Sequence, residues 1–209
     1  MHIVYLLTVA KRATKDGRVV RGLRSRMAVA EAMLELIREG ELRPPLRLVA
    51  ERAGVSLRLV HNHFADREQL FGAAAALQME QVAKHVQAID ADGPLETRLD
   101  NFVKVRARLL EAITPVRRAG LGEEPFSASV RTSLSAIRDA KRKQVTAVFA
   151  DELGRLSGRA AADLARSVCT IASWSTWEEL RAHQSLTSSQ ARRVVKQTLR
   201  AVLLAARTD

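Results

Sequence analysis

A short run in the first third of the chain carries the side chains best suited to chemistry: GVSLRLVHNHFADREQLF, residues 54–71. His61 and His63 could ligate a metal, and Arg58 and Asn62 could hydrogen-bond to another molecule. The two histidines stand at i and i+2, so they project from different sides of a helix, and no Cys, Asp or Glu at ligand spacing joins them. The run therefore favours a surface that holds another molecule over a metal site.

Catalytic signatures are absent from the sequence. It contains none of the patterns GxSxG, GxxxxGK[ST] or GxGxxG, and the carboxylates of residues 54–71 resemble helix-surface and capping groups. Cys169 is the single cysteine, so an intramolecular disulfide or a redox pair is excluded. We expect neither an enzyme nor a bound metal or cofactor.

Composition indicates a helical protein with an anionic partner. The 209 residues are 47% hydrophobic but only 4% aromatic, with alanine, leucine and arginine prominent, which favours an all-α fold. The net charge of +11 makes nucleic acid a plausible partner. The positive excess is divided almost evenly between residues 1–68 and 69–209, so charge alone locates no site.

Hydrophobic periodicity and capping residues place the helices that must position this run. The predicted helices are 24–39, one between Pro45 and Gly54, one capped by Ser56, one from Asp66 to Gln87 with Gln69 completing a capping box, and then about 95–113, a short piece before Leu121, 127–153, 158–182 and 188–206. Thr187 and Gln190 form a second capping box before the last helix. No segment is predicted to be a strand.

Three short helices with a glycine turn between the second and third form a helix-turn-helix pattern, whose third helix can lie in the major groove of DNA. The apolar residues expected to form its core are Val49, Ala50, Ala53, Val55, Leu59, Val60 and Phe64. The residues expected on its outer surface are Arg47, Ser56, Leu57, Arg58, His61 and Asn62.

The run LRLVAERAGVSLRLVHNHFADREQLF resembles the helix-turn-helix of the TetR family of bacterial transcriptional regulators, over about residues 24–71. The matching positions are Ala50, Glu51, Ala53, Gly54, Val55, Ser56, Val60, His61, His63, Phe64, Arg67 and Glu68. His61 stands where the family usually has tyrosine, Arg67 replaces the usual lysine, and Pro44-Pro45 replaces a common Thr pair. Leu57 and Leu59 are less polar than is usual on the reading face.

The resemblance implies roles for the exposed residues. Arg58 would read guanine through paired hydrogen bonds, unless it is simply a solvated arginine. Leu57 can contact a thymine methyl group. The candidates for positioning on phosphates are Arg47, Ser56, His61, His63 and Arg67. For His63 the alternative is a structural role, with its ring beside Phe64 and bonded to backbone.

The resemblance also implies three domains: a basic extension at 1–23, the helix-turn-helix at 24–71, and a helical effector-binding and dimerisation domain at 72–209. A homodimer through the last two helices would bind a palindromic operator and act as a repressor that a small-molecule effector releases. Candidate effector-lining residues, for each of which packing in the core is the favoured alternative, are Phe102, Val105, Arg106, Leu109, Phe126, Phe149, Trp174 and Trp177.

The start of the chain leaves two interpretations open. Residues 1–23 are either a DNA-binding arm or a disordered solubilising tail. The apolar stretch 3–10 lacks a preceding positive region and is too short to span a bilayer, so we expect no signal peptide, no membrane anchor and a cytoplasmic location. The alternative functions are a non-specific DNA-binding protein and a helical-bundle enzyme.

Overall fold

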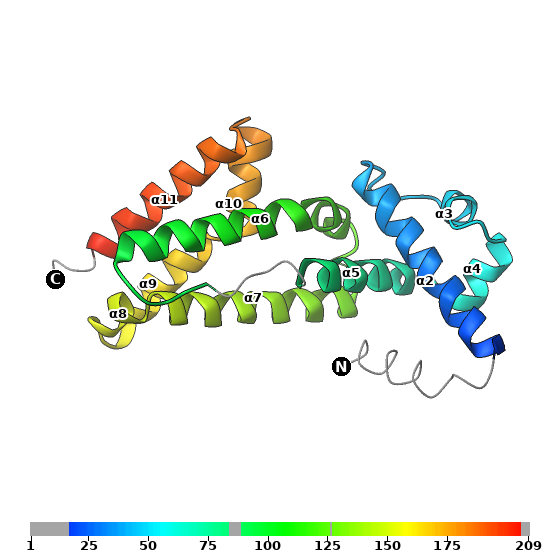
Figure 1. Cartoon of the computed structure of the whole chain (residues 1–209), viewed down its shortest axis with the longest axis horizontal. Helices are drawn as coiled ribbons and strands as arrows, with labels where there is room; N and C mark the ends of the chain where they lie inside the picture. The colour runs from blue at the N-terminus through cyan, green and yellow to red at the C-terminus, as the bar shows by residue number, and fades with distance from the viewer. Residues whose placement is uncertain (1–16, 84–88, 126, 206–209) are drawn as a thin grey trace. The chain divides into compact units, whose positions relative to one another are not determined.

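The computed structural model describes residues 17–83, 89–125 and 127–205. Within these ranges the chain is helical and has no strand, which confirms the predicted all-α class. The elements, most of them labelled in Figure 1, are α2 (Gly17–Arg38), α3 (Leu46–Arg52), α4 (Leu57–His63), α5 (Arg67–Ala83), α6 (Leu95–Leu121), α7 (Ala128–Val148), α8 (Ala150–Gly154), α9 (Gly158–Ile171), α10 (Trp174–Glu178), the π-helical turn η2 (Glu179–His183) and α11 (Ser188–Ala205).

The helices form two compact units. The first unit contains the described residues up to 83 and those of segment 115–131; the second contains 89–114 and 132–205. The sequence analysis placed all of 72–209 in one domain, whereas the structure groups the whole of α5 and segment 115–131 with α2, α3 and α4. The division therefore falls inside the helices α6 and α7.

The first unit is built on the contact between α2 and α5. Met33 and Ile37 of α2 and Leu70 and Ala74 of α5 are at most 1% exposed. The end of α6 lies close to α5, since a Cβ added to Gly120 would be only 3.4 Å from the Phe71 ring. The short helices α3 and α4 both contact α2.

Helix α2 begins at Gly17, seven residues before the predicted start. Residues 17–23 of the expected extension are therefore helical, while residues 1–16, with the basic residues Lys11, Arg12 and Lys15, lie outside the described residues. Val20 and Leu23 are half-buried and continue the apolar side of the helix. Extending an existing helix costs little free energy compared with starting one, so weak apolar contacts suffice to extend α2 through Gly22.

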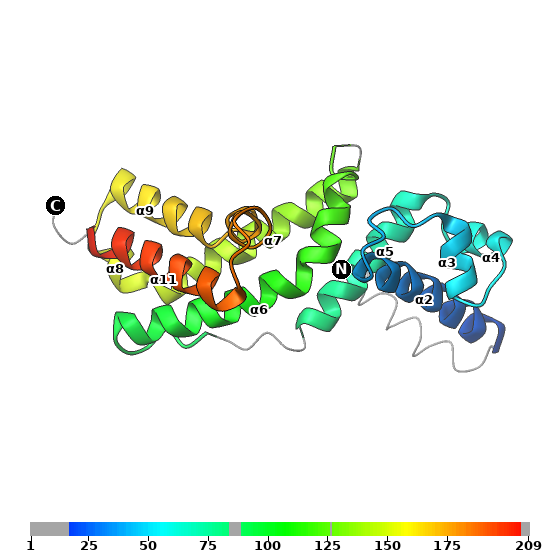
Figure 2. The ribbon, with the colours of Figure 1, turned by 90° about the horizontal axis from the view of Figure 1, so that it is seen from above.

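The second unit packs around a core shared by α6, α7, α9, α10, η2 and α11. Phe102 and Phe149 are fully buried, with ring centroids 5.1 Å apart in an edge-to-face arrangement. Helices α9 and α11 contact each other along one side (Figure 2). Ala191, Val195, Leu199 and Leu203 of α11 face this core, so one apolar side of the last helix packs within the chain.

Several predicted helix boundaries differ from the structure. The two pieces expected at 95–113 and before Leu121 are one helix, α6, which continues through Pro115. The helix expected at 127–153 divides at Phe149 into α7 and α8. The helix expected at 158–182 breaks at Ser173, whose hydroxyl caps α10 by accepting from Thr176 N at 3.2 Å. The capping box Thr187–Gln190 is present with both of its bonds, whereas at the start of α5 Asp66 accepts from Gln69 N and the Gln69 side chain accepts from Ala65 N instead of Asp66 N.

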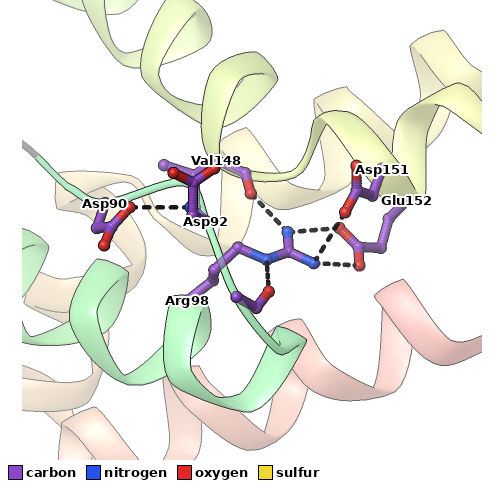
Figure 3. Close-up of polar contacts among 7 residues, drawn as sticks. Asp90, Asp92, Arg98, Val148, Asp151 and Glu152 are labelled. Atoms are coloured by element: carbon purple, nitrogen blue, oxygen red, sulfur yellow. Dashed lines mark hydrogen bonds and ion pairs between the residues drawn. The ribbon is translucent and has the colours of Figure 1, made fainter.

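A buried ion pair fastens α6 to α8 in the second unit (Figure 3). Arg98 donates to both carboxylate oxygens of Glu152 at 2.7 and 2.8 Å, and also to the carbonyls of Gly93 and Val148. The two charged side chains are 4% and 1% exposed. Glu152 and the helix-boundary carbonyls thus satisfy most of the guanidinium, which is the condition under which a buried charge is tolerated.

Candidate nucleic-acid interface

The turn between α3 and α4 depends on a left-handed glycine. Gly54 has φ of +65°, its N–H donates to Glu51 O at 3.2 Å, and Val55 N donates to Ala50 O at 3.0 Å. This pair of bonds is a Schellman ending, which closes α3 and turns the chain. Ser56 then caps α4, its hydroxyl accepting from Leu59 N at 3.2 Å. The predicted glycine stop and serine cap are both confirmed.

The inner side of α3 and α4 forms the small core that the sequence predicted. Val49, Ala50, Val60 and Phe64 are at most 3% exposed, and the remaining predicted core residues Ala53, Val55 and Leu59 are half-buried. Burial of one side fixes which residues of each short helix face outward.

The outer side carries the predicted contact residues. Those that the structure leaves exposed are Arg47, Ser56, Leu57, Arg58, His61 and Asn62. Arg47 pairs with Glu51 at 3.1 Å, but both side chains are more than half exposed, so the pair is weak and easily exchanged for a phosphate. Helix α4 itself carries no acidic residue. Its outer face therefore offers hydrogen-bond donors without a competing carboxylate.

His63 lies apart from this outer face. Its Nε2 is 2.8 Å from the Ser25 hydroxyl, and its carbonyl accepts a hydrogen bond from Arg26. The Arg26 guanidinium also lies 4.2 Å from the centre of the Phe64 ring, a cation–π contact. Ser25 and Arg26 hold the end of α4 and were not among the predicted site residues, although both lie in the predicted helix 24–39.

Stability of the first unit should depend on the protonation of His63. Burial, and then the positive charge of Arg26, lower the pKa of His63 below its ordinary 6.5. The unfolded chain therefore binds this proton more readily, so the contribution is present above pH 6.5 and is lost as the pH falls through the lower folded pKa. We expect wild type to lose thermal stability over this window and His63→Asn to lose less. His61→Asn, on the exposed face, should behave like wild type; identical pH profiles for all three proteins would contradict the assignment.

Arg67 also makes its contacts within the first unit. Its Nη1 donates to Pro44 O at 2.6 Å, and its Nε lies 3.4 Å from Glu123 Oε1. The side chain is 21% exposed. These bonds tie the start of α5 to the segment before α3 and to Glu123.

The candidate effector residues lie mostly in the core of the second unit. Phe102, Phe149 and Trp177 are at most 3% exposed, which makes them packing residues in this structure. Those that are half-buried are Val105, Leu109 and Trp174, and Phe126 lies outside the described residues. Arg106 is 8% exposed and differs from the others because it buries a charge.

No three His, Cys, Asp or Glu side chains among the described residues come together as a metal-binding group. None of the helices in this part of the chain combines the length and the apolar character needed to cross a membrane.

Comparison with known proteins identifies the fold. No family model and no curated protein matches the chain. A TetR-family transcriptional regulator from Streptomyces coelicolor superposes with a TM-score of 0.69 at 17% identity, over 88% of this chain and 82% of its own. A protein from Pseudomonas aeruginosa PAO1, described as a transcriptional regulator, gives 0.64 at 22% identity, over 87% and 92%. The chain thus has the TetR-type fold, with a helix-turn-helix followed by a helical bundle.

Proposed function

We propose that this protein is a sequence-specific DNA-binding transcriptional regulator without enzymatic activity, which acts as a homodimer and represses until a small-molecule effector releases it from a palindromic operator. The observation that carries the proposal is the outer face of α4. Arg58, His61 and Asn62 are exposed on a helix whose opposite side is buried and whose two ends are fixed by Ser56 and by the Ser25–His63 contact. A recognition helix needs this combination of exposed donors and a rigid seat.

Each exposed residue then receives a role. Arg58 reads a base edge, with Asn62 and Leu57 as further base contacts. Arg47, Ser56 and His61 position the helix on phosphates. His63 and Arg67 are positioning residues, because their polar atoms already bond to Ser25 and to Pro44.

Dimerisation would use the outer sides of α9 and α11, since their inner sides are occupied by the core. Small and aliphatic residues are exposed there, among them Ala160 on α9 and Val194, Thr198 and Ala201 on α11. Such residues allow close helix contact. Two copies would place their α4 helices in successive major grooves, about 34–36 Å apart.

Release by an effector follows from a population shift. A ligand that binds the second unit better in a conformation with wrongly spaced α4 helices lowers DNA affinity by its preference between the two states, and no more. Repression is the mode that the TetR-type fold favours.

Footprinting on the DNA upstream of the protein's own coding region tests the proposal. Arg58→Ala should weaken binding to the preferred site by about 1–3 kcal/mol and reduce discrimination, while salt-sensitive non-specific binding remains. Arg108→Ala removes the same charge from an exposed position on α6 and should leave the footprint unchanged. Equal protection of all sequences would favour a non-specific DNA-binding protein, and a monomer that binds no duplex would overturn the proposal.

A further inference from the structure

Two buried arginines of α6 have very different surroundings. Arg98 is held by a carboxylate and two carbonyls (Figure 3). Arg106, about two turns further along the helix, is 8% exposed, and its Nη2 donates to Ala172 O at 2.9 Å. Its Nε is buried and has no hydrogen-bond partner. The hydrogen-bonding groups of Arg98 are thus largely satisfied, whereas the Nε of Arg106 in the same helix is not.

A second cation lies close to Arg106. Lys141 of α7 is half-buried and donates to Cys169 O at 2.8 Å. Burial lowers the pKa of Arg106 to about 10, and burial together with the charges of Arg106, Arg138 and Arg142 lowers the pKa of Lys141. Among the described residues, no Asp or Glu forms an ion pair with Arg106 or Lys141. The Cys169 side chain raises the pKa of both groups and so partly compensates them, but no carboxylate matches the positive charge at this point.

Capping of α9 accounts for only part of this arrangement. Cys169 and Ala172 lie at the C-terminal end of α9, where cations are favourable because the helix end carries about half a negative charge. Two buried or half-buried cations exceed that partial charge. An uncompensated buried charge is costly, and a bound anion would remove the cost by completing the hydrogen bonds of Arg106.

Two half-buried apolar side chains lie near Arg106 and its partner Ala172 along the chain. Leu109 lies one turn beyond Arg106 on α6 and is half-buried. Trp174, at the start of α10 just after Ala172, is half-buried too, and its indole N–H donates to Thr114 Oγ1 at 3.1 Å. A ligand that met the cations through a negative group would therefore place an apolar portion against Leu109 and the indole ring.

We propose that Arg106 and Lys141 form the anion-recognition point of an effector site in the second unit, and that the effector is a small carboxylate with an apolar body. The carboxylate accepts hydrogen bonds from the free Nε of Arg106 and from Lys141, next to the carbonyl end of α9. The regulatory meaning of this site rests on the proposed function, whereas the binding chemistry is independent of it.

Matched pairs of acids and amides test the site. Octanoate and 3-phenylpropionate, each compared with its primary amide, are titrated into the full chain and followed by calorimetry and thermal unfolding. Wild type should bind the acids in preference to the amides and be stabilised by them. Arg106→Met should weaken acid binding about 10- to 100-fold, and Lys141→Met about 3- to 10-fold, without weakening the amides.

The control is Arg108→Met, which removes an exposed arginine of the same helix and should bind like wild type. Without ligand, Arg106→Met should unfold at the same or a higher temperature than wild type, because it removes an uncompensated buried charge. A wild type that favours neither acid over its amide, or an Arg106→Met that keeps the preference, overturns the proposal.

Footprinting of the same proteins separates this inference from the proposed function. Carboxylate binding through Arg106 without protection of any DNA site would support the ligand site and contradict the proposed regulator function. Protection of an operator by a protein that binds the acids no better than their amides would support the regulator function and contradict the ligand site. Acid-induced loss of the footprint in wild type, but not in Arg106→Met, would support both.

Discussion

Replacing Arg98 with methionine is expected to destabilise the second unit by about 3–5 kcal/mol, because the change leaves Glu152 as an unpaired charge in the interior. Both tryptophans of the chain, Trp174 and Trp177, lie in this unit. Tryptophan fluorescence during urea unfolding therefore reports on the affected core directly. The midpoint should fall strongly at neutral pH.

The double variant Arg98→Met with Glu152→Leu is the matched control, since removing both charges and keeping the volume should recover most of the loss. Acidification supplies a second control. In wild type, Arg98 holds the pKa of Glu152 below its usual 4.5, so this contribution is lost only as the pH falls through the lowered value. In Arg98→Met, burial alone would raise that pKa, and the difference from wild type should shrink in acid. A pH-independent difference would contradict this account.

Features that depend on neighbouring residues could be predicted from the sequence. Gly54, Ser56 and the capping box Thr187–Gln190 each fix a helix end through bonds that span at most five positions. The buried and exposed sides of α3 and α4 followed from helical periodicity, so the candidate face with Arg58 could be identified from the sequence.

Long-range contacts explain the remaining differences. His63 contacts Ser25, 38 positions away in the sequence, and Arg98 contacts Glu152, 54 positions away. No local sequence pattern predicts contacts at such separations. The helix predicted to end near residue 113 continues as α6 through Pro115, although a proline removes one helical N–H.

The pairing of charges was likewise invisible in the sequence. Arg98 and Arg106 both precede an apolar residue in one helix, and only the fold gives a carboxylate to the first and none to the second. The net charge of +11 gave no indication of where an uncompensated cation would be buried. Charge counts describe the average field, whereas a binding point depends on which charges remain unmatched after folding.

Replacing Phe64 with alanine is expected to have the largest effect on DNA binding through stability alone, about 3–5 kcal/mol in the free energy of unfolding of the first unit. Phe64 is 2% exposed at the C-terminal cap of α4 and lies under the Arg26 guanidinium. Its loss removes the anchor of the helix end and the partner of Arg26 together, so α4 should no longer hold its orientation although every exposed donor is intact.

Hydrogen exchange of the α3 and α4 amides measures this local loss, alongside footprinting of the preferred site. Phe64→Leu keeps an apolar anchor and should retain most of both signals, whereas Phe64→Ala should exchange rapidly and lose the footprint. Arg58→Ala provides the complementary case, with protected amides and a weakened footprint, because it removes a contact and leaves the core unchanged. If Phe64→Ala bound its site as tightly as wild type, a rigidly seated α4 would not be what reads the DNA.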